Sequence, residues 1–306
     1  MREFKIDFNK AFKWVVLVYA VIFIAGTVFS FFGVNLDINF SGGTKISYSY
    51  TGDIADKDIE DTVKTVIKSP FTVSKSTALA GNTQTFEIAL VGKDAVSAED
   101  QKNLSAELEK KFKDNKIVLY NSNSVSPTVA GSFFLKALVA VVITSILVVI
   151  YVGFRFRKIG GVSAALTALC ALVFDVLIAF FTCVFFGLQI DLNFMAVVLT
   201  ILGYSLNDTI VIYDRVRENR KLNPDMEIGD LVNMSVNKVM IRNIVTTVTT
   251  FLAVTTIIVV SEIYGLTTLR TFAIPMAFGL VSGAVTSLFV SGPLWVIWKR
   301  YKAKKA

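Results

Sequence analysis

Six apolar runs, each long enough to cross a lipid bilayer as a helix, constrain this 306-residue chain more than any other feature. They lie at about 14–32, 133–154, 161–186, 192–213, 243–260 and 271–298. Hydrophobic residues make up 54% of the sequence, which exceeds what a soluble domain of this length carries. The sequence therefore predicts a polytopic α-helical membrane protein with six transmembrane helices.

One polar stretch, residues 34–131, separates the first apolar run from the second. Its predicted elements are, in order, a strand at 46–50, a helix with Asp56 as its N-cap, strands at 71–77 and 86–90, a helix opened by Ser97, and a strand at 117–120. The order βαββαβ is that of an α+β ferredoxin-like domain. The stretch contains no glycine-rich phosphate loop and no metal-ligand spacing, so we expect a mechanical or docking role.

The distribution of lysine and arginine predicts the orientation of the chain. Basic residues gather at the N-terminus, at 155–158, at 214–242 and at the C-terminus, and short basic loops stay in the cytoplasm. The predicted organisation is a cytoplasmic N-terminus with the first, uncleaved span (1–33), an extracytoplasmic domain (34–131), five further spans (132–298) with a cytoplasmic loop at 214–241, and a basic cytoplasmic tail (299–306). Residues 1–13 are expected to form a short interfacial helix. The second half of the 214–241 loop is expected to form an amphipathic helix lying on the membrane.

The absence of histidine restricts the chemistry available to the chain. A protonation switch must use carboxyl groups, and zinc sites or Ser-His catalysis are excluded or nearly so. Cys170 and Cys183 are thirteen residues apart in one span, roughly 20 Å along a helix, so they cannot form a disulfide with each other. We expect no metal and no cofactor.

Asp208 is the main candidate for a functional residue, because it interrupts the fourth apolar run together with Asn207. It lies six residues before Asp214, about 9 Å inside the charged collar at 1.5 Å per residue. An ionisable side chain in hydrocarbon costs at least about 2.5 kcal/mol at the helix centre and needs a partner or a purpose. Asp208 is either a proton or sodium carrier, or a buried acid that bonds a neighbouring helix.

Two further charged residues lie within the apolar runs. Arg242 opens the fifth run, followed on the same side of the helix by threonines at 246, 249 and 250. It can pair with Asp208 across the two spans or extend to the lipid headgroups. Asp175 lies deeper, near the middle of the third run, and can share a proton with Asp208 or bond polar groups of the fourth span.

Small residues predict close contacts between the spans. Gly203 and Ser205 give the fourth span a thin face, and Gly279, Gly283, Ser287 and Ser291 repeat every four residues in the sixth. Pro275 and Pro293 are expected to mark a bend and a helix end.

Several segments resemble the SecF family, whose members form the smaller membrane subunit of the bacterial SecDF accessory complex of the protein translocase. The most specific is GYSLNDTIVIYDRVREN at 203–219. The others are INFSGG at 38–43, which contains Gly42 and Gly43, SPTVAG at 126–131, FDVLI at 174–178, IDLNFMAVVLTILGYSLNDT at 190–209 and IRNIVTTVTT at 241–250. Together they extend over nearly the whole chain.

The resemblance implies a half-unit of the RND transporter superfamily that pairs with SecD into a pseudo-symmetric twelve-span unit. It implies work beside the SecYEG channel, the SecA motor and YajC on exported unfolded polypeptides, driven by the proton or sodium motive force at the bacterial cytoplasmic membrane. Asp208 matches the family's membrane carboxylate and Arg242 its cytoplasmic-side arginine, both implicated in ion coupling. Two positions depart from the family pattern: Asn39 replaces a usual acid, and Phe174 replaces a common histidine.

Three other functions compete with this interpretation. An intramembrane aspartyl protease would use Asp175 and Asp208 as a proton-sharing pair, although GYSLND is not the Gly-x-Gly-Asp sequence of such enzymes. An RND-type exporter of lipids or small molecules would need a larger outer domain. A passive assembly subunit would use its membrane acids for packing alone. We expect a protein that is not an enzyme.

Overall fold

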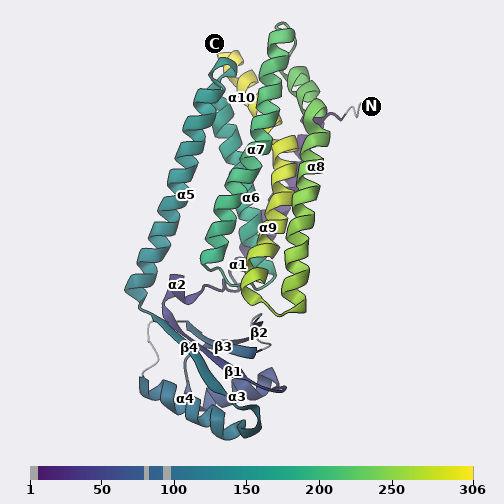
Figure 1. Ribbon diagram of the computed structural model, residues 1–306. Helices are drawn as coiled ribbons and strands as arrows, with labels where there is room; N and C mark the ends of the chain where they lie inside the picture. The colour runs from purple at the N-terminus through teal and green to yellow at the C-terminus, as the bar shows by residue number, and fades with distance from the viewer. Residues whose placement is uncertain (1–5, 79–82, 92–97, 306) are drawn as a thin grey trace.

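The computed structural model describes residues 6–78, 83–91 and 98–305. It has an elongated bundle of long helices with a small sheet domain at one end (Figure 1). The long helices are α1 (Phe8–Ser30), α5 (Pro127–Arg155), α6 (Gly161–Phe185), α7 (Leu192–Leu222), α8 (Ile228–Ile263), and α9 (Thr267–Thr286), which continues through the π-helical η3 (Ser287–Ser291) into α10 (Gly292–Lys305). Within the described residues, six helical segments are long and apolar enough to span a membrane. The prediction of a six-span, multi-pass membrane protein is confirmed.

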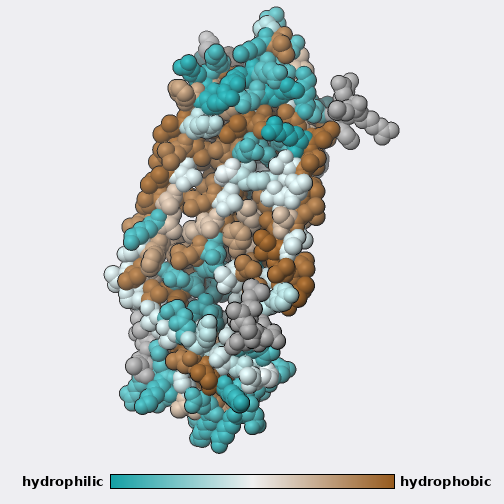
Figure 2. Space-filling view, in the orientation of Figure 1, coloured by the Kyte–Doolittle hydropathy of each residue, from teal (hydrophilic) through white to brown (hydrophobic). Residues whose placement is uncertain are grey.

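The outer surface of the bundle agrees with this assignment. On the face that Figure 2 shows, a hydrophobic band covers the helices between two more hydrophilic ends. The exposed large side chains of α1 and α5 are mostly apolar, for example Ile24 and Leu147. Such side chains are suited to lipid.

Two helices differ from the sequence prediction at their ends. Residues 228–241 form no separate surface helix, because α8 runs without a break from Ile228 through the fifth span. Its first turns are packed inside the protein: Leu231, Val232 and Val236 are fully buried. Asn233 Oδ1 also accepts a hydrogen bond from the Phe8 backbone N–H at 2.9 Å. The apolar face that suggested a membrane-lying helix is therefore covered by neighbouring helices.

The start of α1 and the helix near the C-terminus also differ from the sequence prediction. Asp7 caps α1 by accepting a hydrogen bond from the Lys10 amide, and the helix then continues into the membrane. Residues 6–13 thus form no separate interfacial helix, and the expected helix over residues 1–5 lies outside the described residues. Pro275 lies inside α9, and Pro293 follows the π-helical turn near the start of α10 instead of ending a helix.

The sheet domain has the predicted order of elements. It consists of β1 (Gly43–Tyr50), α3 (Asp56–Val66), β2 (Phe71–Ala78), β3 (Thr83–Val91), α4 (Ala98–Lys111) and β4 (Val118–Val125). The strands are antiparallel in the order β2-β3-β1-β4, and both helices cover the face away from the membrane bundle (Figure 1). Its core is formed by apolar side chains of the strands and of both helices, among them Ile46, Tyr48, Phe86, Ile88, Ile59, Val63, Leu104 and Leu108. The ferredoxin-like prediction is confirmed.

Two details of the sheet domain differ from the prediction, and a third cannot be compared. Ala55, not Asp56, is the N-cap of α3, and Asp56 is its first residue. The last strand runs on to Val125 instead of ending at Tyr120. Ser97, the expected cap of α4, lies outside the described residues.

A short connection joins α1 to the sheet domain. Residue Leu36 forms a parallel bridge with Ile190, and α2 (Ile38–Ser41) follows, with Asp37 as its N-cap. Asn39 donates a side-chain hydrogen bond to Asp37, so the amide that departs from the family pattern stabilises this turn. Gly42 and Gly43 have φ values of 78° and 139°, which other residues rarely adopt. A Cβ on Gly43 would also collide with the Leu90 carbonyl oxygen.

The small residues of α9 and η3 pack along α7, as predicted. Gly279 faces Ile201, and Gly283 faces Ser205. One and two turns further on, Ser287 Oγ lies 3.1 Å from Thr209 Oγ1, and the Ser291 carbonyl accepts a hydrogen bond from Tyr213 at 3.3 Å. We name these four contacts the α7–α9 seam. Gly203 is not part of it, because an added Cβ there would meet no atom within 4 Å.

Candidate functional site

The polar groups of the bundle interior form two separate sites, one around Asp175 and one around Asp208. Asp175 of α6 is fully buried, and Asp208 of α7 is 2% exposed. No hydrogen bond joins the two carboxyl groups in the part of the chain that the structure describes. The shared-proton pair that an aspartyl protease needs is therefore not formed here.

Asp175 lies in a cage of hydroxyl groups that hold α6, α7 and α9 together. Ser205 of α7 and Ser282 of α9 each donate a hydrogen bond of 2.6 Å to its carboxyl oxygens. Thr286 donates at 2.9 and 3.0 Å. Tyr19 of α1 extends the cage, because its hydroxyl lies 2.9 Å from Ser282 Oγ. A carboxylate accepts hydrogen bonds only, and three hydroxyl donors meet that need without a cation.

Aromatic side chains of α6 and α1 pack beside this cage. Phe174 stacks on Tyr19 at 5.6 Å between ring centroids and meets Phe23 edge-on at 5.2 Å. The position where the family commonly has a histidine thus carries a packing residue. No imidazole can relay a proton to Asp175 in this chain.

Asp208 has the opposite surroundings. Its Oδ2 atom is buried and accepts no hydrogen bond from any described residue. Arg242 of α8 is close enough for its charge to act on the carboxyl group, but no ion pair joins the two side chains. The Arg242 side chain itself is exposed on the flank of the bundle. A buried acid without hydrogen bonds is costly, so Asp208 has an incomplete set of partners.

Two residues beside Arg242 share this feature, and the sequence analysis did not select them. Asn243 Nδ2 and Thr247 Oγ1 are buried on α8, one turn apart, and have no hydrogen-bond partner among the described residues. The threonines at 246, 249 and 250 donate hydrogen bonds to carbonyl groups of their own helix, and Thr250 also accepts one from Tyr204 of α7 at 3.2 Å. The sequence does contain a signal for these two residues, because Asn243 and Thr247 are polar residues one helical turn apart within an apolar run.

The surface of α7 next to Asp208 is open. Asn207 and Gly203 are both exposed in this chain, and on this side of the bundle pale and hydrophilic side chains interrupt the hydrophobic band (Figure 2). An amide facing lipid is unfavourable. We name this surface, defined by Gly203, Asn207 and Arg242, the polar flank.

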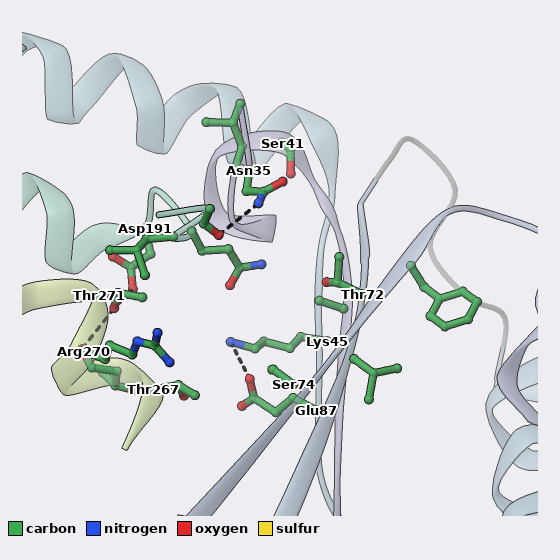
Figure 3. A pocket seen from close by; sticks show the side chains of 18 of the residues that line it. Asn35, Ser41, Lys45, Thr72, Ser74, Glu87, Asp191, Thr267, Arg270 and Thr271 are labelled. Carbon is green, nitrogen blue, oxygen red and sulfur yellow. Dashed lines mark hydrogen bonds and ion pairs between the residues drawn. The ribbon is translucent and has the colours of Figure 1, made fainter. Parts of the chain in front are cut away.

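A second feature lies where the sheet domain meets the bundle. A crevice of about 560 Å³ is lined by β1, β2 and β3 on one side and by the loop before α7 and the start of α9 (267–271) on the other (Figure 3). Lys45 extends into it and pairs with Glu87 at 2.9 Å. Burial lowers the pKa of Lys45, but the hydrogen bond and charge of Glu87 outweigh this and raise it overall. Lys45 is therefore positively charged at any physiological pH.

The comparisons with known proteins agree on one family. Residues 104–301 match the family model described as "Protein export membrane protein SecD/SecF, C-terminal". The chain is 34% identical to protein translocase subunit SecF of Sebaldella termitidis over 94% of this chain and 90% of that one. It is 30% identical to SecF of Alicyclobacillus acidocaldarius over 99% and 96% of the two chains. Among solved structures, SecDF of Thermus thermophilus, "a translocon-associated membrane protein", matches with a TM-score of 0.78 and 25% identity, over 97% of this chain and 39% of that one.

Proposed function

This chain belongs to the SecD/SecF family of protein export membrane proteins, and from that premise we propose that it is the SecF-type subunit of a SecDF complex. Its relatives over nearly their whole length are named protein translocase subunit SecF. The complex would use the proton or sodium motive force to assist protein translocation through the Sec channel. Both termini would lie in the cytoplasm and the sheet domain outside, as the basic residues of 155–158, 214–242 and 299–306 indicate.

A SecD-type partner would bind to the polar flank. The Thermus thermophilus SecDF chain is more than twice as long as this one, since the match covers 39% of it. A separate partner would supply the remainder. The exposed Asn207 and the open space above Gly203 suit a helix that packs closely and satisfies the amide. SecYEG, SecA, YajC and exported unfolded polypeptides would be further partners of the assembled complex.

The observation that carries the proposal is the buried, unbonded Oδ2 atom of Asp208 beside the charge of Arg242. Gain or loss of one proton, or binding of one sodium ion, would change the net charge of this site. An elementary charge that crosses the membrane potential supplies about 2.3 kcal/mol per 100 mV. That is comparable to the few kcal/mol that separate alternative conformations of a protein.

The crevice offers a route by which helix movement would reach the sheet domain. Asp191 caps α7 by accepting a hydrogen bond from the Phe194 amide at 3.0 Å, and it lines the crevice opposite Lys45 (Figure 3). A shift of α7 would therefore displace a charged group that faces the sheet. The outer domain would move with it and act on the emerging polypeptide.

The test is Asp208→Asn in a strain or reconstituted membrane that depends on this protein for ion-driven export. We expect the stimulation of export by the ion gradient to disappear, while co-purification with the SecD-type partner is unchanged. Glu218→Gln is the matched control, an acid on the same helix outside the apolar run, and it should retain stimulation. Undiminished stimulation in Asp208→Asn would reject the coupling role and leave an assembly subunit.

A further inference from the structure

A concave basic surface lies at the end of the bundle opposite the sheet domain. It is a pocket of about 340 Å³ between the end of α5, the short helix η2 (Arg157–Ile159) and the last turns of α7. It is lined by Phe154, Arg155, Arg157, Lys158, Arg217 and Lys221. We name it the basic pocket. None of these residues belongs to the ion-coupling site described above.

Two of its arginines are held in place by one acid. Arg155 and Arg217 come from different helices, and both pair with Asp214, at 3.1 and 2.9 Å. The acid therefore fixes one wall of the pocket across α5 and α7. One carboxylate offsets only one of the two guanidinium charges.

The other three cationic side chains are available to a ligand. Lys158 and Lys221 are exposed and form no ion pair with any described residue. The Arg157 guanidinium lies 5.6 Å from the centre of the Phe154 ring, a cation–π contact that keeps its charge. The basic pocket thus combines five cations with one acid, and it favours an anion with several acceptor oxygens.

The position of the basic pocket indicates where that anion comes from. Phe154 is 73% exposed and lies in the last turn of the apolar helix α5, so the pocket sits at the level where hydrocarbon gives way to headgroups. The outward face of α5 below it carries Ile143, Leu147 and Ile150, all about half exposed or more, which suits acyl chains. We propose that the basic pocket binds the phosphate of an anionic phospholipid, with the acyl chains along α5. Basic pockets between transmembrane helices bind such headgroups in other membrane proteins.

The experiment compares lipids retained by the full chain in native mass spectrometry, after equilibration with phosphatidylglycerol and phosphatidylcholine in equal amounts. The test variant carries Arg157→Gln, Lys158→Gln and Lys221→Gln, and leaves the Asp214 pairs intact. The control carries Lys13→Gln, Lys302→Gln and Lys304→Gln, which remove the same charge from exposed sites outside the pocket. Each basic residue near an anionic surface contributes about fivefold to binding, so we expect at least a tenfold loss of phosphatidylglycerol in the test variant alone.

Equal loss in both triple variants would overturn the proposal, because the retention would then follow overall charge. Retention of inorganic phosphate, added alone, without any preference for phosphatidylglycerol would also overturn it in favour of a soluble anion. So would unchanged lipid retention together with loss of a co-purifying protein. If the triple variant does not purify, Lys221→Gln alone should still lower phosphatidylglycerol retention several-fold against Lys302→Gln, and no difference between them would count against the pocket.

Discussion

Asp175 and Asp208 are both aspartates inside the bundle, yet their surroundings assign them different tasks. Asp175 accepts hydrogen bonds from three hydroxyl groups on two neighbouring helices, while Asp208 Oδ2 accepts none from the part of the chain that the structure describes. A fully bonded carboxylate gains little from a change of charge state, whereas an unbonded one is unstable as it stands. We therefore infer that Asp175 mainly holds helices together and that Asp208 carries the functional change.

This difference predicts that Thr286→Val destabilises the bundle. The substitution keeps the shape of the side chain but removes a donor from a buried carboxylate, at a cost of about 1–3 kcal/mol. A lower midpoint of thermal unfolding in detergent, followed by circular dichroism, would measure it. Thr256→Val is the control, because that exposed hydroxyl donates to the Leu252 carbonyl of its own helix and not to a carboxylate, and it should change the midpoint little. Equal midpoints for the two variants would contradict the proposed cage.

The sequence located these acids but not their partners. A charge within an apolar run is visible in one chain, so Asp208, Arg242 and Asp175 could all be selected. The hydroxyl donors Ser282 and Thr286 looked like ordinary small or polar residues of the last span. Recognising them requires the rotation and depth of α9 relative to α6, which no local pattern contains.

At the scale of the helix, the α7–α9 seam and the polar flank use small residues for opposite purposes. Gly279 is in contact with Ile201 inside the chain, whereas Gly203 faces open space. Both glycines suggested close packing in the sequence. The structure separates a glycine that packs within this subunit from one that is open to a partner.

The two glycines therefore give a matched pair of variants. Gly279→Leu should destabilise the isolated chain by about 1–3 kcal/mol through overpacking against Ile201. Gly203→Leu should leave the isolated chain as stable as before and weaken its co-purification with a SecD-type partner. Thermal unfolding of the purified chain and pull-down of the partner measure the two effects. Normal partner binding by Gly203→Leu would place the interface elsewhere.

The apolar runs of the sequence predicted that each membrane helix exists, but they did not predict where several of these helices begin and end. The turns around Leu231 and Val236 have an apolar face that fits either a membrane surface or a protein neighbour. The structure shows a protein neighbour, because these turns contact the N-terminal segment. Glu227, just before them, also pairs with Arg300 at 3.0 Å. Such contacts join residues more than 70 positions apart, so a window of local sequence cannot reveal them.

At the scale of the whole molecule, Lys45 ties the sheet to the connection beneath it. Its ammonium group lies 2.9 Å from Glu87 of β3 and 3.9 Å from Asp37 before α2. Its charge also acts on Asp191 of the bundle. These contacts join the sheet domain, the connection and the membrane helices in one crevice.

Lys45→Met should therefore loosen the sheet domain from the bundle. Spin labels at Asp61 on α3 and Ile263 at the end of α8, in a chain with both native cysteines replaced by alanine, would report the distance between the two parts. We expect a broader distance distribution in Lys45→Met and a distribution like the parent's in Lys45→Arg, which keeps the charge. Equally narrow distributions in all three proteins would show that Lys45 does not contribute to the docking.

The unbroken course of α8 has a mechanical consequence. Its 36 residues measure about 54 Å at 1.5 Å per residue, well beyond the roughly 30 Å of a bilayer's hydrocarbon core. It packs antiparallel to α7, and the two helices carry Asp208 and Arg242 partway along their lengths. If α8 tilts as a rigid body about that point, its two ends move in opposite directions. One small tilt would therefore displace residues on both sides of the membrane at the same time.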